Sequence, residues 1–141
     1  MLPSPCKCGN SSATHPTKLI VLTGGPGAGK TAIVEMARRR FCEHVVIVPE
    51  AASIIFSGGF WRNQTEVFRN AAQRAIYHVQ HELERAIMEE GKAVLGLCDR
   101  GTIDSEAYWT GDVERFWREV GSDKKTELAR YHSVIHLRTP T

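Results

Sequence analysis

The chain has 141 residues, 42% of them apolar, so it can bury one hydrophobic core of ordinary size and hardly two. Its 18 basic and 16 acidic residues leave a formal net charge of +2, and the basic residues are scattered, so nucleic acid is not an expected partner. No run approaches the roughly 18 apolar residues that a membrane-spanning helix needs, and the N-terminal segment lacks the apolar region of a secretory signal.

Residues 1–17 are rich in Pro, Ser, Gly and Asn, a composition that predicts a flexible tail before a domain over residues 18–141. Cys6 and Cys8 in this tail lack the two-residue spacer and the second ligand pair of a zinc site. Cys42 and Cys98 lie in apolar stretches, where a free thiol behaves as a small hydrophobic side chain. This cysteine usage favours a reduced, cytoplasmic compartment.

Four apolar runs predict β-strands along the rest of the chain. They cover residues 18–23, 43–50, 92–98 and 132–138. Helical patterns separate them, and near-continuous apolar strands in this arrangement are typical of a parallel sheet with helices on both faces. Right-handed crossovers place the third strand beside the first and the second strand outside it. The expected fold is therefore a three-layer α/β/α fold with strand order 2-3-1-4.

Helices are expected at residues 30–40, from about Ala51, and at 65–90, 112–120 and 124–131. The longest of them has six apolar residues at helical spacing, which are Phe68, Ala72, Ile76, Val79, Leu83 and Ile87. Asn63, followed by Glu66 three residues later, predicts the cap at its start. Gly91 predicts its end.

A glycine-rich loop joins the first strand to the first helix. It consists of Gly24, Gly25, Pro26, Gly27, Ala28, Gly29, Lys30 and Thr31. The loop matches the pattern GxxxxGK[ST] between a strand and a helix, the context that this pattern requires. The glycines let backbone N–H groups surround an anion at the helix N-terminus, Lys30 reaches the β- and γ-phosphates, and Thr31 offers a hydroxyl to Mg²⁺. We therefore expect a site for Mg²⁺ and a nucleoside triphosphate, either ATP or GTP.

Two carboxylates follow the neighbouring strands, Asp99 after the third and Glu50 after the second. Ligands of open α/β sheets bind beyond the carboxyl ends of the strands. Strand spacing places Asp99 about 5 Å and Glu50 about 10 Å to the side of the loop. Asp99 is therefore the expected ligand of Mg²⁺, and Glu50 is expected to face an acceptor. The alternative is that Asp99 belongs to a turn and that Glu50 caps a helix.

The segments TGGPGAGKT, VPEAA and CDRGTIDSEAY, in this order, resemble the P-loop NTPase domains of the AAA_28 type, a grouping of ATPase-like and kinase-like domains. The chain is also similar to deoxynucleoside kinases and thymidylate kinases. By that resemblance Glu50 takes the proton from an attacking hydroxyl, Asp99 serves Mg²⁺, and Arg100 stabilises charge on the moving phosphoryl group. Gln73 falls near the position where those kinases read a base; its alternative is a glutamine on the helix surface.

The chain departs from these kinases at two places. Asp99 stands where deoxynucleoside kinases have glutamate, and Gly101 follows Arg100 where they have serine. P-loop kinases also carry a fifth strand and an arginine-bearing lid, whereas this chain ends soon after its fourth strand. The expected domain is therefore C-terminally incomplete, without the lid and the final strand.

Other side chains have two interpretations each. Three arginines and three aromatic residues either surround an acceptor or belong to the surface and the core: Arg62, Arg69, Arg74, Trp61, Tyr108 and Trp109. Asp104 is expected to contact Arg62 or Arg100.

Two functions remain open on the sequence. The first is a Mg²⁺-dependent, ATP-binding kinase that transfers the γ-phosphate to a hydroxyl of a small nucleoside-like or nucleotide-like acceptor, whose identity the sequence leaves open. The second is an ATP- or GTP-binding switch or ATPase with little transfer. A regulatory GTPase is less favoured because the guanine-reading NKxD pattern is absent after the last strand.

Overall fold

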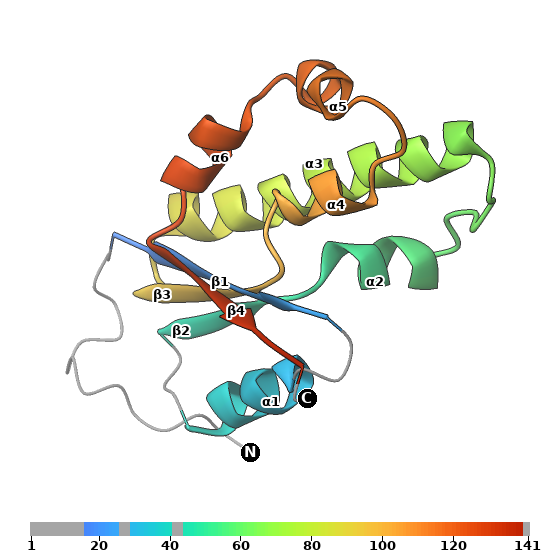
Figure 1. The fold of residues 1–141 in the computed structure, drawn as a ribbon. Helices are drawn as coiled ribbons and strands as arrows, with labels where there is room; N and C mark the ends of the chain where they lie inside the picture. Colours follow the sequence, from blue (N-terminus) through green and yellow to red (C-terminus); the bar gives the residue numbers. More distant parts are fainter. Residues whose placement is uncertain (1–15, 26–28, 41–43, 140–141) are drawn as a thin grey trace.

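A computed structural model describes residues 16–25, 29–40 and 44–139. Four strands form one parallel sheet, and helices cover both of its faces (Figure 1). The strands are β1 (Lys18–Gly24), β2 (Val45–Val48), β3 (Leu95–Asp99) and β4 (Ser133–Leu137). The helices are α1 (Lys30–Arg40), α2 (Ala51–Ser57), α3 (Glu66–Glu90), α4 (Asp104–Tyr108), α5 (Val113–Val120) and α6 (Lys124–Ala129).

The strand order is β2-β3-β1-β4, which confirms the expected three-layer fold and its sheet. Leu22 of β1 pairs with Asp99 of β3, and Val48 of β2 pairs with Cys98 of the same strand. All strands are parallel, so the ends of β1, β2 and β3 lie at one edge of the sheet. This edge receives the glycine-rich loop and both candidate carboxylates.

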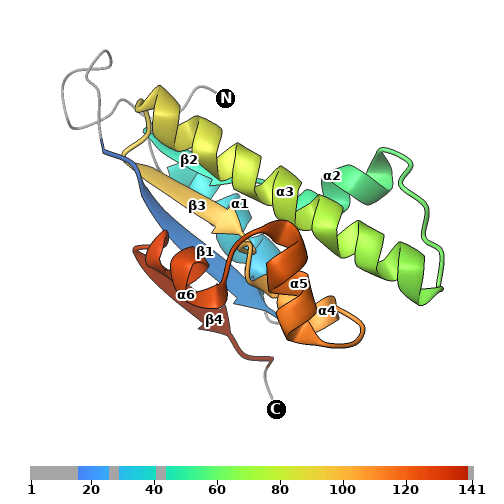
Figure 2. The ribbon, with the colours of Figure 1, turned by 90° about the horizontal axis from the view of Figure 1, so that it is seen from above.

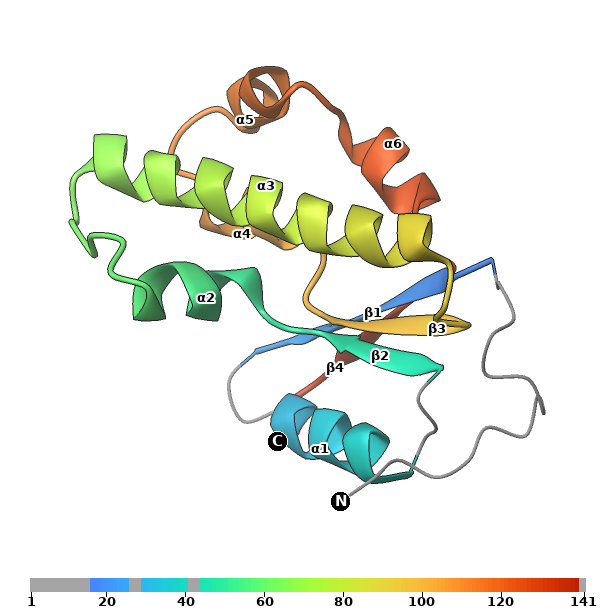
Figure 3. The ribbon, with the colours of Figure 1, turned by 180° about the vertical axis from the view of Figure 1, so that it is seen from behind.

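Helix α1 lies on one face of the sheet, and α3, α5 and α6 lie on the other (Figures 1 and 2). Successive side chains of β1 point to opposite faces, so each helical layer has its own apolar cluster. On the α1 side Leu22 and Leu97 pack with Val34, and on the α3 side Leu19 and Val21 pack with residues that include Leu83. Full burial of one leucine side chain contributes about 2 kcal/mol to folding. Helix α2 runs from the end of β2 and packs against α3, beyond the sheet edge (Figure 3).

The long helix has a more polar interior than its apolar spacing predicts. Of its six regularly spaced apolar residues, Ala72 is buried and the other five are half-buried, and Tyr77, Gln80 and Glu84 are buried as well. The reason is that α3 is covered on two sides, by the sheet and by the segment around α5 and α6. A single-face helical pattern does not anticipate this second covered side.

The predicted cap of α3 at Asn63 is wrong. The cap is Thr65, whose hydroxyl accepts a hydrogen bond from the N–H of Phe68 at 3.5 Å. The Asn63 side chain instead accepts from the N–H of Thr65 at 2.9 Å, a turn that precedes the helix. The predicted end is confirmed, because Gly91 adopts a left-handed conformation with φ 67°.

Several boundaries differ from the expectation. The second and third strands are shorter than their apolar runs and begin at Val45 and Leu95. Just before them, the N–H of Val94 donates to the carbonyl of His44 at 2.8 Å. The sequence pattern did not predict α4, a helix of only five residues. The predicted tail falls mostly on residues 1–15, outside the described residues, and within the described part no helix is long and apolar enough to span a membrane.

Candidate functional site

The glycine-rich loop lies between the end of β1 and the start of α1. Gly24 and Gly25 on one side and Gly29, Lys30 and Thr31 on the other are described, whereas Pro26, Gly27 and Ala28 lie outside the described residues. Gly29 has φ 90°, a conformation that residues with a Cβ rarely adopt. It leads directly into α1, and the N-terminus of this 11-residue helix favours negative charge. The strand and the helix predicted on the two sides of the loop are therefore present.

Lys30 lies between the two carboxylates that the sequence singled out. Its ammonium group donates a hydrogen bond to Oδ1 of Asp99. The same group is 3.3 Å from Oε2 of Glu50. All three side chains are partly buried, and each comes from a different element or its end. From the spacing of neighbouring strands, Glu50 was expected to lie farther from the loop than Asp99, but both carboxylates contact Lys30.

Arg100 has an unusual backbone conformation, and its side chain contacts Gly24 at the start of the glycine-rich loop. Its φ is 70°, and it is the one described non-glycine residue with a positive φ. A left-handed conformation costs such a residue about 1–2 kcal/mol. Its side chain donates to the carbonyl of Gly24 at 3.2 Å and lies 3.6 Å from Oε2 of Glu50. Backbone strain of this kind, retained at a charged residue beside a loop, is common at functional sites.

Gly101 has a packing reason that the comparison with kinases could not supply. A Cβ there would lie 2.9 Å from Cγ2 of Val21 and 3.1 Å from the hydroxyl of Tyr131. A serine at this position would therefore push against the sheet and against Tyr131. The departure noted in the sequence reflects how closely this loop crosses β1.

Asp104 holds the turn between β3 and α4, which contains Arg100 and Gly101. Its Oδ1 accepts from the hydroxyl of Thr23 at 2.6 Å, and its Oδ2 accepts from the N–H of Gly101 at 2.7 Å. Oδ1 also lies 3.9 Å from Nη1 of Arg100, which is one of the two contacts expected for this residue. Asp104 thus links the end of β1 to the turn that holds Arg100.

A cavity of about 360 Å³ opens beside Glu50 and Arg100. Helix α2 contributes Ser53 and Phe56, and α3 contributes Gln73, Ile76 and Gln80. Tyr108 and Arg62 complete its outer part. The fold therefore brings Glu50, Arg100 and Gln73 to one cavity, although the three are far apart in sequence.

Three of the other candidates do not line this cavity. Trp109 is buried in an aromatic cluster with Tyr77 and Phe116, so it belongs to the core. Arg74 pairs with Glu119 at 3.6 Å and lies over the Trp109 ring. Trp61 is 69% exposed and packs against Phe68.

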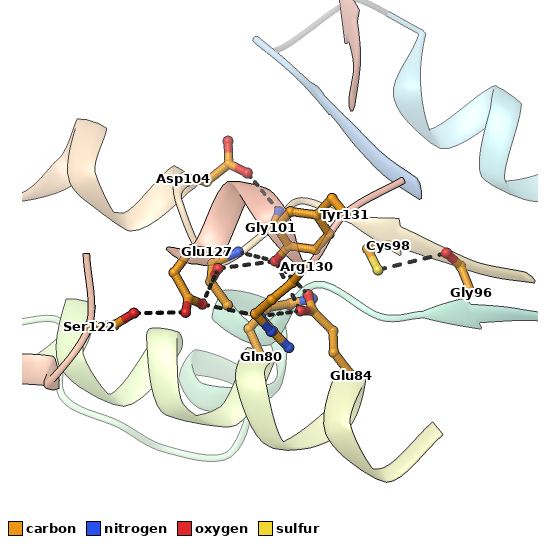
Figure 4. A network of polar contacts seen from close by, with 11 residues as sticks. Gln80, Glu84, Gly96, Cys98, Gly101, Asp104, Ser122, Glu127, Arg130 and Tyr131 are labelled. Carbon is orange, nitrogen blue, oxygen red and sulfur yellow. Dashed lines mark hydrogen bonds and ion pairs between the residues drawn. The ribbon is translucent and has the colours of Figure 1, made fainter. Parts of the chain in front are cut away.

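A buried polar network supports the turn after β3 that carries Arg100 (Figure 4). The sequence pattern did not reveal this network. Glu84 of α3 is fully buried and accepts hydrogen bonds from the side chain of Gln80 at 2.6 Å and from the hydroxyl of Tyr131 at 2.9 Å. The Tyr131 hydroxyl in turn accepts from the N–H of Thr102 at 2.8 Å. Burial raises the pKa of the Glu84 carboxyl, and Arg130 pairs with it at 3.0 Å.

The network joins parts of the chain that shape the site. Gln80 also lines the cavity, and Thr102 lies two residues after Arg100. The hydroxyl of Thr102 donates to Glu127 of α6 at 2.8 Å, which adds a second anchor. The turn that carries Arg100 is therefore held by α3, by α6 and by Tyr131.

The donor set limits what kind of metal this site could hold. Among the described residues, no group of three or more His, Cys, Asp or Glu side chains could hold a metal ion. Thr31 and Asp99 offer two oxygen donors near the start of α1. Two protein oxygens suit Mg²⁺, which usually keeps several waters and takes further ligands from phosphates. Thr31 and Asp99 therefore fit a magnesium–phosphate ligand better than a metal held by protein alone.

The comparisons with known proteins agree with this picture of the loop and sheet. The model of the AAA_28 family, described as an AAA domain, matches residues 19–141. The matched range contains the glycine-rich loop, both carboxylates and the residues of the cavity. Among curated proteins, none matches the chain.

Proposed function

The chain belongs to the AAA_28 family of nucleotide-binding P-loop domains, and we propose that it is a Mg²⁺-dependent kinase that transfers the γ-phosphate of ATP, or of GTP, to a hydroxyl of a small acceptor. The observation that carries this proposal is the place of Glu50. Its carboxylate contacts the lysine of the phosphate-binding loop and also lines the cavity beside that loop. A cavity of about 360 Å³ suits a nucleoside or vitamin in size.

The donor half of the site follows from the loop. The phosphates would be surrounded by backbone N–H groups of the loop, from Gly24, Gly25, Gly27, Ala28 and Gly29; Pro26 has no N–H to offer. Lys30 would contact the β- and γ-phosphates. Thr31 and Asp99 would hold Mg²⁺. The bound ion would neutralise charge on the phosphate oxygens.

The acceptor half is the cavity. A ring held near Phe56 and Tyr108 would present its polar edge to the amide of Gln73, and an acceptor hydroxyl at the inner end would lie beside Glu50. The position of Gln73 in the cavity supports its role as a substrate contact over that of a surface glutamine.

In the proposed reaction, the acceptor oxygen forms a bond to the γ-phosphorus. The bond from that phosphorus to the oxygen that bridges to the β-phosphate breaks, and the nucleoside diphosphate leaves with this oxygen. Glu50 takes the hydroxyl proton, and Arg100 stabilises charge on the moving phosphoryl group. Since Lys30 and Arg100 both contact Glu50, two positive charges adjoin the path between acceptor and donor. A cytoplasmic location, where ATP is abundant, is part of this proposal.

The test is whether ATP consumption depends on an acceptor. The protein is incubated with Mg²⁺ and ATP, alone and with each member of a panel of nucleosides and vitamins, and the products are identified by mass. A kinase gives ATP loss that rises with a particular acceptor and a phosphorylated product. ATP loss that no acceptor changes would favour the other candidate, an ATPase or nucleotide-dependent switch.

A further inference from the structure

A second hollow of about 160 Å³ adjoins the acceptor cavity on its outer side. The two share Phe56, Arg62, Gln73 and Tyr108 in their walls, so they lie side by side and are together called the groove. Its inner end lies at Glu50 and Arg100, and its outer end lies at Arg69. The groove is therefore longer than the space that a single ring with one hydroxyl would fill.

The charges along this groove are separated. Its acidic wall residues, Glu50 and Asp104, both line the inner part and contact Arg100 there. The outer hollow is lined by Arg62 and Arg69 and by no acidic residue. An acceptor would thus meet excess positive charge only at the outer end.

Arg62 stacks on an aromatic ring, and among the described residues none accepts a hydrogen bond from its guanidinium. The carbon of its guanidinium lies 4.2 Å from the centre of the Phe56 ring. A guanidinium stacked on a ring keeps its in-plane N–H groups available for a carboxylate or phosphate. The stacking also orders a side chain that would otherwise lose conformational freedom on binding a ligand.

Within residues 16–25, 29–40 and 44–139, neither Arg62 nor Arg69 has a carboxylate partner. Arg74, on the same helix as Arg69, pairs with Glu119, and Arg100 pairs with Glu50. Arg62 and Arg69 are thus the lining arginines whose charge the described protein leaves uncompensated in the groove. This separates them from the arginines that serve the fold.

We propose that the outer hollow is an anion-binding subsite, and that the acceptor is an elongated molecule with a hydroxyl at one end and a phosphate or carboxylate at the other. Arg62 and Arg69 bind the anionic group, while Phe56 and Tyr108 contact the planar middle. The subsite rests on the proposed function only in assigning the hydroxyl end to Glu50. The binding of the anion itself depends on the two arginines and on the groove.

The experiment compares acceptors in matched pairs that keep the same hydroxyl. One pair type is a nucleoside and its 3′-monophosphate, which leaves the 5′-hydroxyl free, and another is pantothenol and pantothenate. The proteins are the wild type, Arg62→Gln, Arg69→Gln and the control Arg118→Gln, which removes an exposed arginine of α5 outside the groove. Thermal melting shows which variants are folded. A further variant, Arg62→Lys, keeps the positive charge but loses the planar guanidinium that stacks on Phe56.

In the wild type, we expect the charged member of a pair to have a KM at least about 10-fold lower than the neutral member. The reason is that only the charged member forms a charge-assisted hydrogen bond with the arginines. Arg69→Gln, which lies outside the acceptor cavity, should raise the KM of the charged member by about 10-fold and leave the neutral member unchanged. Arg62→Gln should raise the KM of the charged member by about 10-fold and that of the neutral member by clearly less. Arg118→Gln should change neither. Phosphate-selective or carboxylate-selective gains identify which anion the subsite accepts.

Binding is measured separately by calorimetry with a non-hydrolysable ATP analogue present, so that the two proposals can fail independently. Charged probes that bind more weakly to Arg62→Gln, yet are not phosphorylated, support the subsite and contradict the kinase. Equal affinity for charged and neutral members, or an equal loss of both in Arg62→Gln, overturns the subsite even where phosphorylation occurs.

Discussion

At the residue scale, the chemistry depends on two carboxylates that touch the same lysine and have different second contacts. Asp99 follows the strand beside β1, whereas Glu50 also contacts Arg100 and lines the cavity. Shared contact with Lys30 means that position alone does not separate their roles. The second contact does, because of the two carboxylates only Glu50 lines the cavity that we propose for the acceptor.

Replacement of each carboxylate by its amide tests this division. Glu50→Gln should leave triphosphate affinity nearly unchanged and slow transfer by about 10²-fold or more, because the proton acceptor is lost. Asp99→Asn should instead raise the Mg²⁺ concentration needed for half-maximal nucleotide binding. Calorimetry at a series of Mg²⁺ concentrations measures both. A Mg²⁺ shift in Glu50→Gln and none in Asp99→Asn would reverse the assignment.

Gly101 provides a test of how the backbone places Arg100. Gly101→Ala would bring a methyl group against Val21 and Tyr131, so the free energy of unfolding should fall by about 1–3 kcal/mol and transfer should fall with it. Gly121→Ala is the matched control, because φ 75° strains any side chain there but nothing lies within 4 Å of the added Cβ. It should cost about 1 kcal/mol and spare transfer. Equal transfer losses in the two variants, measured by denaturation and kinetics together, would mean that stability alone explains them.

At the scale of elements, α3 links the acceptor cavity to the support of the loop after β3. Gln73, Ile76 and Gln80 line the cavity, and farther along the helix Glu84 accepts hydrogen bonds from Gln80 and from the hydroxyl of Tyr131. A buried carboxylate of this kind is tolerated because three partners satisfy it. The apolar spacing of the helix gave no sign of it, since Glu84 falls among the positions that a helical pattern assigns to solvent.

The pH dependence of stability should report on Glu84. Burial raises the pKa of its carboxyl above the ordinary 4.5, so the folded state holds this proton more tightly than the unfolded chain does. Its contribution is therefore present below about pH 4.5 and is lost as the pH rises through the folded-state pKa. Glu84→Gln removes this titration. Denaturant unfolding at a series of pH values should show the wild type losing stability relative to Glu84→Gln as the pH rises; parallel curves would contradict the assignment.

At the scale of the whole molecule, the parts of the fold that follow from local rules were predictable. Continuous apolar strands, a GxxxxGK[ST] loop and right-handed crossovers predict the order β2-β3-β1-β4. The left-handed Arg100 was not predictable, because it depends on contacts with the distant residues Gly24 and Glu50. The cap at Thr65 was missed for a local reason, since Asn63 two residues earlier has a side chain of the same capping chemistry. For the site, strand ends pointed to Glu50 and Asp99, whereas the cavity that joins Glu50 to Gln73 requires the packing of α2 on α3.

Nucleotide binding should stabilise the domain as a unit. A ligand that binds only the folded state at 100 times its Kd adds about 2.7 kcal/mol to the free energy of unfolding. Mg²⁺ and ATP together should therefore raise Tm in the wild type, and Lys30→Ala should lose most of this increase because the phosphates lose their lysine contact. Differential scanning calorimetry with and without nucleotide measures it. The same increase in Lys30→Ala would show that the loop is not the binding site.

The central claim is that Glu50 connects the phosphate-binding loop to an acceptor, and the fate of the γ-phosphate tests it most directly. ATP labelled at the γ-phosphate is mixed with Mg²⁺, the protein and the preferred acceptor, and the label is divided between phosphorylated acceptor and inorganic phosphate. Most of the label should be found on the acceptor, and Glu50→Gln should abolish this transfer while ATP still binds. Label found only in inorganic phosphate, at the same rate in both proteins, would contradict this claim.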